Sequence, residues 1–241
     1  MTALAVALVA LVPPASAQPP AQPSEVVASA SARPGSPSDH TWLFGNKLVR
    51  WPSCRPLTYR VNPDKAPDGW KKLVRKALKK AKKASHLRFR YVGRSHQKVR
   101  NASHNPRGTD LVIAFLAPRQ TNMLNGQGVA GQGGAASNGR RLLNGKVVLN
   151  GPVLRQMAGG FGTGPVNGIQ GTQGQILMHE IGHALGLGHA QDPSQVMYPT
   201  ATRKPAEWGA GDWKGLRVLG KGGCRGGRVT ASGERSTAWL R

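Results

Sequence analysis

Residues 179–189 read HEIGHALGLGH, so that three histidines, a glutamate and a glycine stand at the offsets HExxHxxGxxH. On a helix, His179 and His183 project from the same face about one turn apart, near enough to share one metal ion. Glu180 lies next to the first of them and is not needed for coordination, so its carboxylate is available to move a proton. A buried amphipathic helix that carries these residues by coincidence is the alternative. It explains the pattern poorly, because with average residue usage the five positions coincide at on the order of one in ten million starting points.

Gly186 and His189 complete the pattern. A glycine can take the left-handed backbone conformation that ends a helix and turns the chain back. His189 then reaches the same ion as a third nitrogen ligand, and three protein ligands leave zinc an open position for water, as in catalytic zinc sites. We therefore expect one catalytic Zn²⁺ held by His179, His183 and His189, with Glu180 as the general base and then the general acid.

A second motif follows downstream, where residues 195–199 read QVMYP. A methionine-centred turn just after HExxHxxGxxH marks the metzincin zinc endopeptidases. Within them, Asp192 followed by VMYP at 196–199 resembles the matrixin branch, which includes small secreted bacterial relatives of the matrix metalloproteases. The resemblance covers about residues 45–224, with its specific motifs confined to 179–199. It implies a secreted zinc-dependent endopeptidase that hydrolyses peptide bonds of a protein or peptide substrate with a zinc-activated water.

The resemblance also implies roles for side chains near the metal. Met197 would form a hydrophobic floor beneath the ion, and Tyr198 and Pro199 would begin the wall of the pocket for the substrate side chain after the cut. Tyr198 directly follows the methionine instead of standing two places after it, so we do not expect it to bind zinc. Asp212 corresponds to an acid that supports the Met turn from behind in matrixins, and a plain helix N-cap is the alternative.

A glycine-rich stretch at residues 126–139 holds the place of the edge strand that lines the matrixin cleft. We expect a peptide substrate to pair there through backbone hydrogen bonds, with Val129, Ala130 and Gly131 in the substrate pocket. A disordered loop is the alternative, because such a density of glycine is also typical of loops.

The remaining patterns predict a fold of class α/β (α+β). Residues 70–85 carry apolar side chains at helical spacing, and residues 110–116 are apolar enough to be a strand buried on both faces. We expect the metzincin zinc-protease fold, a twisted mixed sheet of about five strands with two long helices, zinc helix, Met turn and C-terminal helix. Besides the edge strand, the expected elements are strand 57–62, helix 70–85, strands 87–92, 110–116 and 147–150, the zinc helix 173–185 and helix 211–219.

The ends of the chain predict export. Residues 1–17 hold an apolar run and then Ala-Ser-Ala, the small-x-small form of a signal-peptidase site. The run lacks a basic flank, so an uncleaved signal anchor is the alternative, and only then do we expect membrane contact. Residues 18–44 predict a flexible leader rich in Pro, Ala and Ser, 45–224 the catalytic domain and 225–241 a flexible tail. We expect a secreted, extracellular protein, and association with the cell envelope is the alternative.

The chain has two cysteines, Cys54 and Cys224. An even number in an exported chain favours a disulfide, here between the two ends of the catalytic domain, and two free thiols are the alternative. In animal matrixins, a cysteine of the prodomain occupies the zinc and keeps the enzyme latent. Neither Cys54 nor Cys224 lies in such a segment, so we do not expect this kind of latency, the cysteine switch.

The chain is strongly basic, with 34 Lys and Arg against 10 Asp and Glu and a net charge of +24. Residues 70–85, which we call the basic helix, carry a large share of this charge on their polar face. A surface this basic attracts polyanions, such as anionic cell-wall polymers. Because no aromatic-interleaved pattern accompanies it, we expect no specific nucleic acid, and a solvated face without a partner is favoured over a polyanion contact. The scattered acids do not support a calcium site.

Two other functions stay open. One is a polyanion- or cell-wall-binding envelope protein with a structural zinc, against which Glu180 argues, because a closed structural site needs no carboxylate beside an open metal position. The other is a zinc amidase that acts on wall peptides. We expect the protein to be a monomer whichever function it has.

Overall fold

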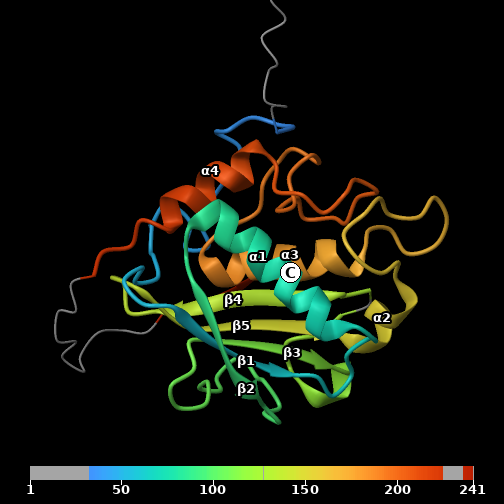
Figure 1. Ribbon diagram of the computed structural model, residues 1–241, viewed down its shortest axis with the longest axis horizontal. Helices are drawn as coiled ribbons and strands as arrows, with labels where there is room; N and C mark the ends of the chain where they lie inside the picture. The colour runs from blue at the N-terminus through green and yellow to red at the C-terminus, as the bar shows by residue number, and fades with distance from the viewer. Residues whose placement is uncertain (1–32, 127, 225–235, 241) are drawn as a thin grey trace, which may run out of the picture. The chain divides into compact units, whose positions relative to one another are not determined.

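The computed structural model describes residues 33–126, 128–224 and 236–240 (Figure 1). The expected signal peptide, residues 1–17, and the first part of the expected leader lie outside the described residues. The elements in chain order are β1 (Leu57–Asn62), α1 (Trp70–Ser85), β2 (Phe89–Arg94), β3 (Leu111–Leu116), the 3-10 turn η1 (Pro118–Gln120), β4 (Gly131–Ser137), β5 (Leu142–Asn150), α2 (Gly151–Gln156), α3 (Gln173–Leu185), α4 (Ala210–Leu219) and β6 (Ser236–Leu240).

The sheet is mixed, as the sequence predicts, with strand order β2-β1-β3-β5-β4-β6. β1, β2, β3 and β5 pair in parallel, whereas β4 pairs antiparallel to both β5 and β6. About five strands were expected, and β6 is the additional one. It comes from the segment expected to be a tail, and pairs with Gly133–Ser137 of β4. The edge predicted to bind substrate is therefore covered over that length by the chain's own strand.

The core lies on both faces of the sheet, as predicted for the apolar strand that forms β3. Leu111, Ile113 and Phe115 face the larger cluster beneath the helices, while Val112 and Ala114 belong to a smaller cluster on the opposite face. Helices α1 and α3 pack against each other on the first of these faces (Figure 1). In the described residues, none of the helices combines the length and apolar character that a membrane span requires.

Residues 131–137 of the glycine-rich stretch form the strand β4, with all seven residues buried, whereas the described residues before it are not in a strand. The glycines allow the helix α3 to lie directly on the strand. A Cβ atom at Gly133 would stand 2.3 Å from the backbone oxygen of Glu180, and one at Gly131 would stand 2.8 Å from the Glu180 Cγ. Side chains at these positions would push the helix away from the sheet. Glycine weakens a strand locally, but here it allows α3 to lie close to β4.

Residues 33–44, expected as part of a flexible leader, instead pack beside the third histidine. Thr41 Oγ1 donates to the backbone oxygen of His189 over 2.7 Å, and the Leu43 N–H donates to the oxygen of Gly186 over 2.9 Å. The Asp39 carboxylate accepts from the N–H groups of Gln191 and Asp192, each over 2.8 Å. The leader prediction was wrong for this part, because short polar groups here satisfy backbone groups far along the chain.

Cys54 and Cys224 form a disulfide, with their Cα atoms 5.4 Å apart and a sequence separation of 170. The predicted pairing is thus confirmed. It closes nearly the whole folded region into one covalent loop, since Cys54 precedes β1 and Cys224 follows α4.

Candidate metal centre and substrate cleft

The helix that carries two of the histidines, α3, has well-defined ends. The Thr172 side chain accepts a hydrogen bond from the Gln175 N–H at the N-terminus. Gly186 ends the helix with φ 114°, the left-handed conformation predicted for it, which costs a glycine little. The chain then reverses, and the Leu187 N–H donates back to the Gly182 oxygen. This reversal brings His189 above the helix.

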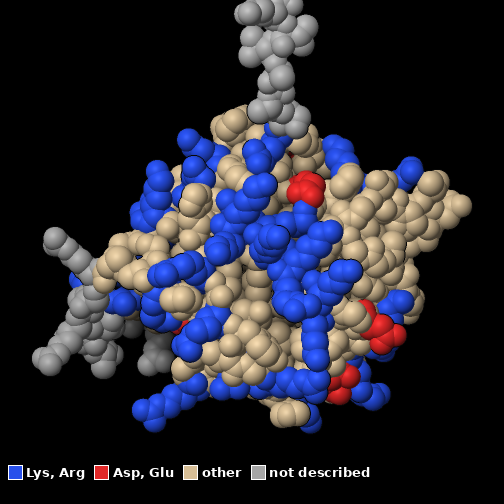
Figure 2. Space-filling view, in the orientation of Figure 1, with Lys and Arg blue, Asp and Glu red and all other residues tan. Residues whose placement is uncertain are grey.

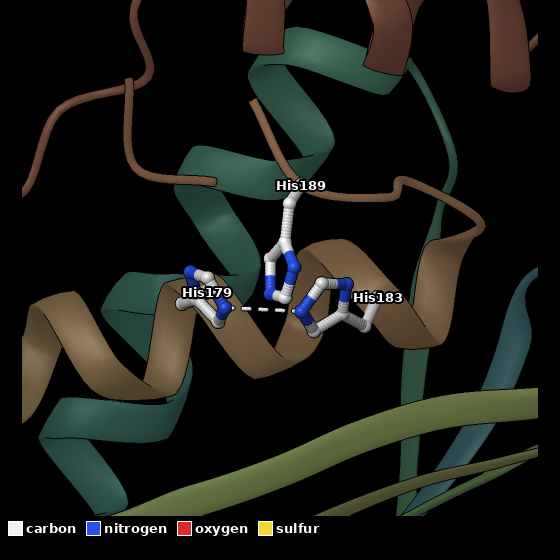
Figure 3. Close-up of side chains that lie close together, drawn as sticks. All are labelled: His179, His183 and His189. Carbon is white, nitrogen blue, oxygen red and sulfur yellow. Dashed lines mark hydrogen bonds between the residues drawn. The ribbon is translucent and has the colours of Figure 1, made fainter. Parts of the chain in front are cut away.

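The three histidines converge on one point. His179 and His183 project from one side of α3, and His189 comes down from the segment that follows the turn (Figure 3). One nitrogen of each ring lies within 4.8 Å of the other two. The spacing HExxHxxGxxH therefore places three imidazoles where a single ion can reach all of them.

The hydrogen bonds of the α3 histidines fix which nitrogen faces the centre. His179 Nδ1 lies 2.8 Å from the Val196 oxygen, and His183 Nδ1 lies 2.9 Å from the Leu187 oxygen. A carbonyl oxygen only accepts, so each Nδ1 carries the proton and each Nε2 presents a lone pair. The two Nε2 atoms are 3.0 Å apart (dashed in Figure 3). Lone pairs this close repel each other unless a cation lies between them, so the donor set fits zinc.

Burial disfavours charge on these side chains. It lowers the pKa of His179 to about 4, and burial together with the neighbouring His179 lowers the pKa of His183 well below its usual value. Both rings are therefore neutral at neutral pH, which is the form that binds a metal. Burial also raises the pKa of Glu180 well above its usual value, and a divalent cation on the adjacent imidazoles acts in the opposite direction.

The methionine turn lies directly under α3. A Cβ atom at Gly182 would stand 2.2 Å from Met197 Sδ, so the glycine makes room for the thioether. Asp212 holds the turn from behind, because its carboxylate accepts from the N–H groups of Val196 over 2.6 Å and Met197 over 3.3 Å. It also accepts from the N–H of Gly209, which is the N-cap residue of α4, so Asp212 itself stands inside the helix and is not its N-cap.

A cavity of about 590 Å³ opens beside His179 and Glu180. All five residues predicted for the substrate pocket line it, namely Val129, Ala130, Gly131, Tyr198 and Pro199. Glu180 stands between the cavity and β4, and within the described residues its Oε2 atom is buried without a hydrogen-bond partner. The arrangement suits a carboxylate that exchanges a proton with a molecule entering the cavity.

Sequence reasoning missed one wall of this cavity. Val153 and Met157 line it from α2 and the residue after it, and Ile169 and Ile176 line it from the loop before α3 and from α3 itself. Helix α2 has only six residues, too few for a helical pattern to show. The one available signal was Asn150 before Gly151-Pro152, a polar cap followed by proline in the first turn.

Comparisons with known proteins agree with this geometry. The sequence model of the family described as matrixin matches residues 50–219. A segment of 22 residues is 68% identical to matrilysin of Homo sapiens, covering 9% of this chain and 8% of that protein. A segment of 25 residues is 64% identical to matrilysin of Rattus norvegicus, covering 10% and 9%. The aligned segments thus span less than a tenth of the length of these curated relatives.

Proposed function

Because this chain belongs to the matrixin family, we propose that it is a secreted zinc endopeptidase that hydrolyses internal peptide bonds of proteins. The observation that carries the proposal is the convergence of three imidazole nitrogens within 4.8 Å, beside a buried carboxylate on the wall of one cavity. His179, His183 and His189 would hold the ion. When bound, zinc polarises the scissile carbonyl and lowers the pKa of a coordinated water toward about 7.

Glu180 supplies the proton transfers in this proposal. Its carboxylate accepts the proton of the attacking water and then delivers it to the departing amine, so the same residue is base and acid in turn. The absence of a side chain on Gly131, next to Glu180 Cγ, keeps the approach to the carboxylate open. Met197 and Asp212 position the histidines from below and do not touch the reacting atoms.

The cavity and β4 together would hold the peptide. A substrate that runs antiparallel to β4 places the residues before the cut along Gly133–Ser137 and the side chain after the cut in the cavity. This direction follows because Glu180, on α3, lies beside Gly131, the first residue of β4, and also lines the cavity. The mostly apolar walls, with Val129, Val153 and Met157, favour an apolar side chain there. Export is supported by the disulfide, since such bonds persist in oxidising compartments.

The test is cleavage of a mixed peptide library by the full chain, with cut sites read by mass spectrometry. One sample contains a zinc chelator, and a third receives chelator followed by excess zinc. We expect internal cuts that disappear with chelator and return with zinc, with apolar residues enriched after the cut. A folded, zinc-loaded protein that leaves the library intact but releases peptides from purified cell wall would replace the proposal with the amidase.

A further inference from the structure

A second pocket lies at the opposite end of the sheet from the metal centre. Its volume is about 300 Å³, and it is formed by β1, by the edge strand β2 and by the start of α1. In the sheet, β3 and β5 separate β1 from β4, and none of its lining residues borders the catalytic cavity. The lining residues are Tyr59, Val61, Trp70, Lys71, Val74, Arg75, Tyr91 and Arg94.

Three aromatic rings meet in this pocket although they are far apart in the sequence. Tyr59 and Tyr91 are partners in the register of β1 and β2, and their ring centroids are 5.3 Å apart at an angle of 48°. Trp70 adds a third ring from the first residue of α1. Tyr91 is 48% exposed, an unusually large exposed fraction for a hydrophobic ring in this protein. Tyr59 is buried beneath the pocket, so the ring surface open to a ligand, here called the aromatic platform, is that of Tyr91 and part of Trp70, with Tyr91 tilted against Tyr59.

Three cations surround the rings. Lys71 Nζ and Arg94 Cζ each lie 5.9 Å from the Trp70 ring centroid, and Arg75 lines the same pocket. No carboxylate lines it, and across the ranges that the structure describes none of the three cations takes part in an ion pair. Figure 2 shows Lys and Arg side chains gathered over α1 with very few acidic groups among them. The positive charge at the pocket is thus not neutralised by the protein.

We propose that this pocket binds an acidic polysaccharide, separately from peptide hydrolysis. The flat C–H faces of sugar rings can stack on the aromatic platform while Lys71, Arg75 and Arg94 pair with the carboxylate or sulfate groups along the chain. Single-stranded nucleic acid has related chemistry, but the disulfide places the folded protein outside the reducing cytosol, and the tilted rings offer no slot for a planar base.

The proposal departs from one expectation of the sequence analysis. The sequence analysis favoured a solvated face without a partner over a polyanion contact for the basic helix, because no aromatic residues alternate with its lysines. The rings come instead from β1, β2 and the first residue of α1, and only the parallel pairing of β1 with β2 brings Tyr59 beside Tyr91. A face that combines rings with unneutralised cations can select a partner, whereas charge alone attracts any polyanion.

The test measures binding of alginate, a polyuronate, to the full chain at about 0.15 M salt, where diffuse attraction is screened. Tyr91→Ser removes a ring without changing charge, and we expect the dissociation constant to rise roughly tenfold. Arg75→Gln with Arg94→Gln removes two pocket cations. Its matched control, Lys79→Gln with Lys83→Gln, removes the same charge from exposed positions of α1 that do not line the pocket.

We expect the pocket variants to weaken alginate binding while the control pair binds as the parent does. All variants should keep the parent's melting temperature and peptidase rate, because the pocket lies away from the metal centre. Equal weakening by the two double variants would overturn the proposal in favour of diffuse charge. So would a parent that does not bind alginate, or that binds an oligo-dT strand more tightly than alginate.

Discussion

At the scale of single residues, the proposed mechanism gives Glu180 a role in catalysis that is separate from metal binding. Its neighbour His179 contributes a nitrogen to the centre, whereas the Glu180 carboxylate faces β4 and the cavity. Glu180→Gln keeps the size and shape of the side chain but cannot accept the proton of water. We expect zinc content equal to the parent and a kcat lower by about a hundredfold to ten-thousandfold, measured by metal analysis and peptide cleavage. A variant that cleaves as fast as the parent rules out Glu180 as the base.

Asp212 gives a pH dependence to stability. Burial raises its pKa to about 6, although hydrogen bonds from Val196, Gly209 and Met197 act the other way. The folded state therefore holds a proton that the unfolded state releases between about pH 4 and 6, so this group's contribution to the free energy of unfolding falls as pH rises through that window. Above the window the contribution is constant.

The Asp212→Asn variant tests this at fixed temperature by urea unfolding at pH 4, 5, 6 and 7. We expect the free energy of unfolding of the parent, relative to the variant, to fall by up to about 3 kcal/mol across the series. The variant keeps the parent's other titratable groups, so the change of this difference with pH reports on Asp212. A difference that stays constant from pH 4 to 7 would show that Asp212 titrates normally.

At the scale of elements, β4 and α3 depend on each other through glycine. Gly133→Ala would place a Cβ atom 2.3 Å from the Glu180 backbone oxygen, and neither backbone can move without disturbing the sheet or the metal centre. We expect a loss of at least about 2 kcal/mol in the free energy of unfolding, measured by urea titration. Gly162→Ala is the matched control, because nothing lies within 4 Å of its Cβ position. Equal stability of the two variants would contradict the close packing.

The pairing of β6 with β4 predicts competition with long substrates. β6 covers the edge of β4 from Gly133 to Ser137, where the residues before the cut would pair. In a chain that ends at Arg235, we expect kcat/KM to rise several-fold for peptides with four or more residues before the cut. Short peptides that reach only the cavity serve as the control and should be cleaved at the parent's rate. Equal gains for both lengths would exclude competition at this edge.

The sequence predicts those elements whose signals are local. The helix 173–185 and the left-handed Gly186 agree with the structure because capping residues and histidine spacing act within a few turns. The strand that is now β5 begins five residues earlier than the predicted Val147, because its pairing with β3 and β4 extends it. Helix α2 is too short for a helical pattern to show, and strand β6 and the aromatic pocket depend on contacts between distant segments, for which a single sequence carries no periodic signal.

At the scale of the whole molecule, the disulfide restrains the unfolded chain more than any local contact can. Because the cysteines are 170 residues apart, the chain-entropy estimate of their contribution is about 5 kcal/mol, reduced by any strain. We expect Cys54→Ser with Cys224→Ser to unfold at markedly lower urea concentration while the zinc content of the folded protein is unchanged. Reduction of the parent by dithiothreitol should give the same midpoint. Unchanged stability would mean that the unfolded chain is already compact.

The contacts of residues 33–44 make the position of the third histidine depend on the segment before the first strand. Asp39, Thr41 and Leu43 hold the backbone on either side of His189 and at the turn before it. A protease that nicks the chain between Leu43 and the first strand would leave every zinc ligand in place but release the segment that steadies the third one. We therefore expect a chain cut after Leu43 to lose zinc faster than the full chain, because the backbone beside His189 loses these contacts.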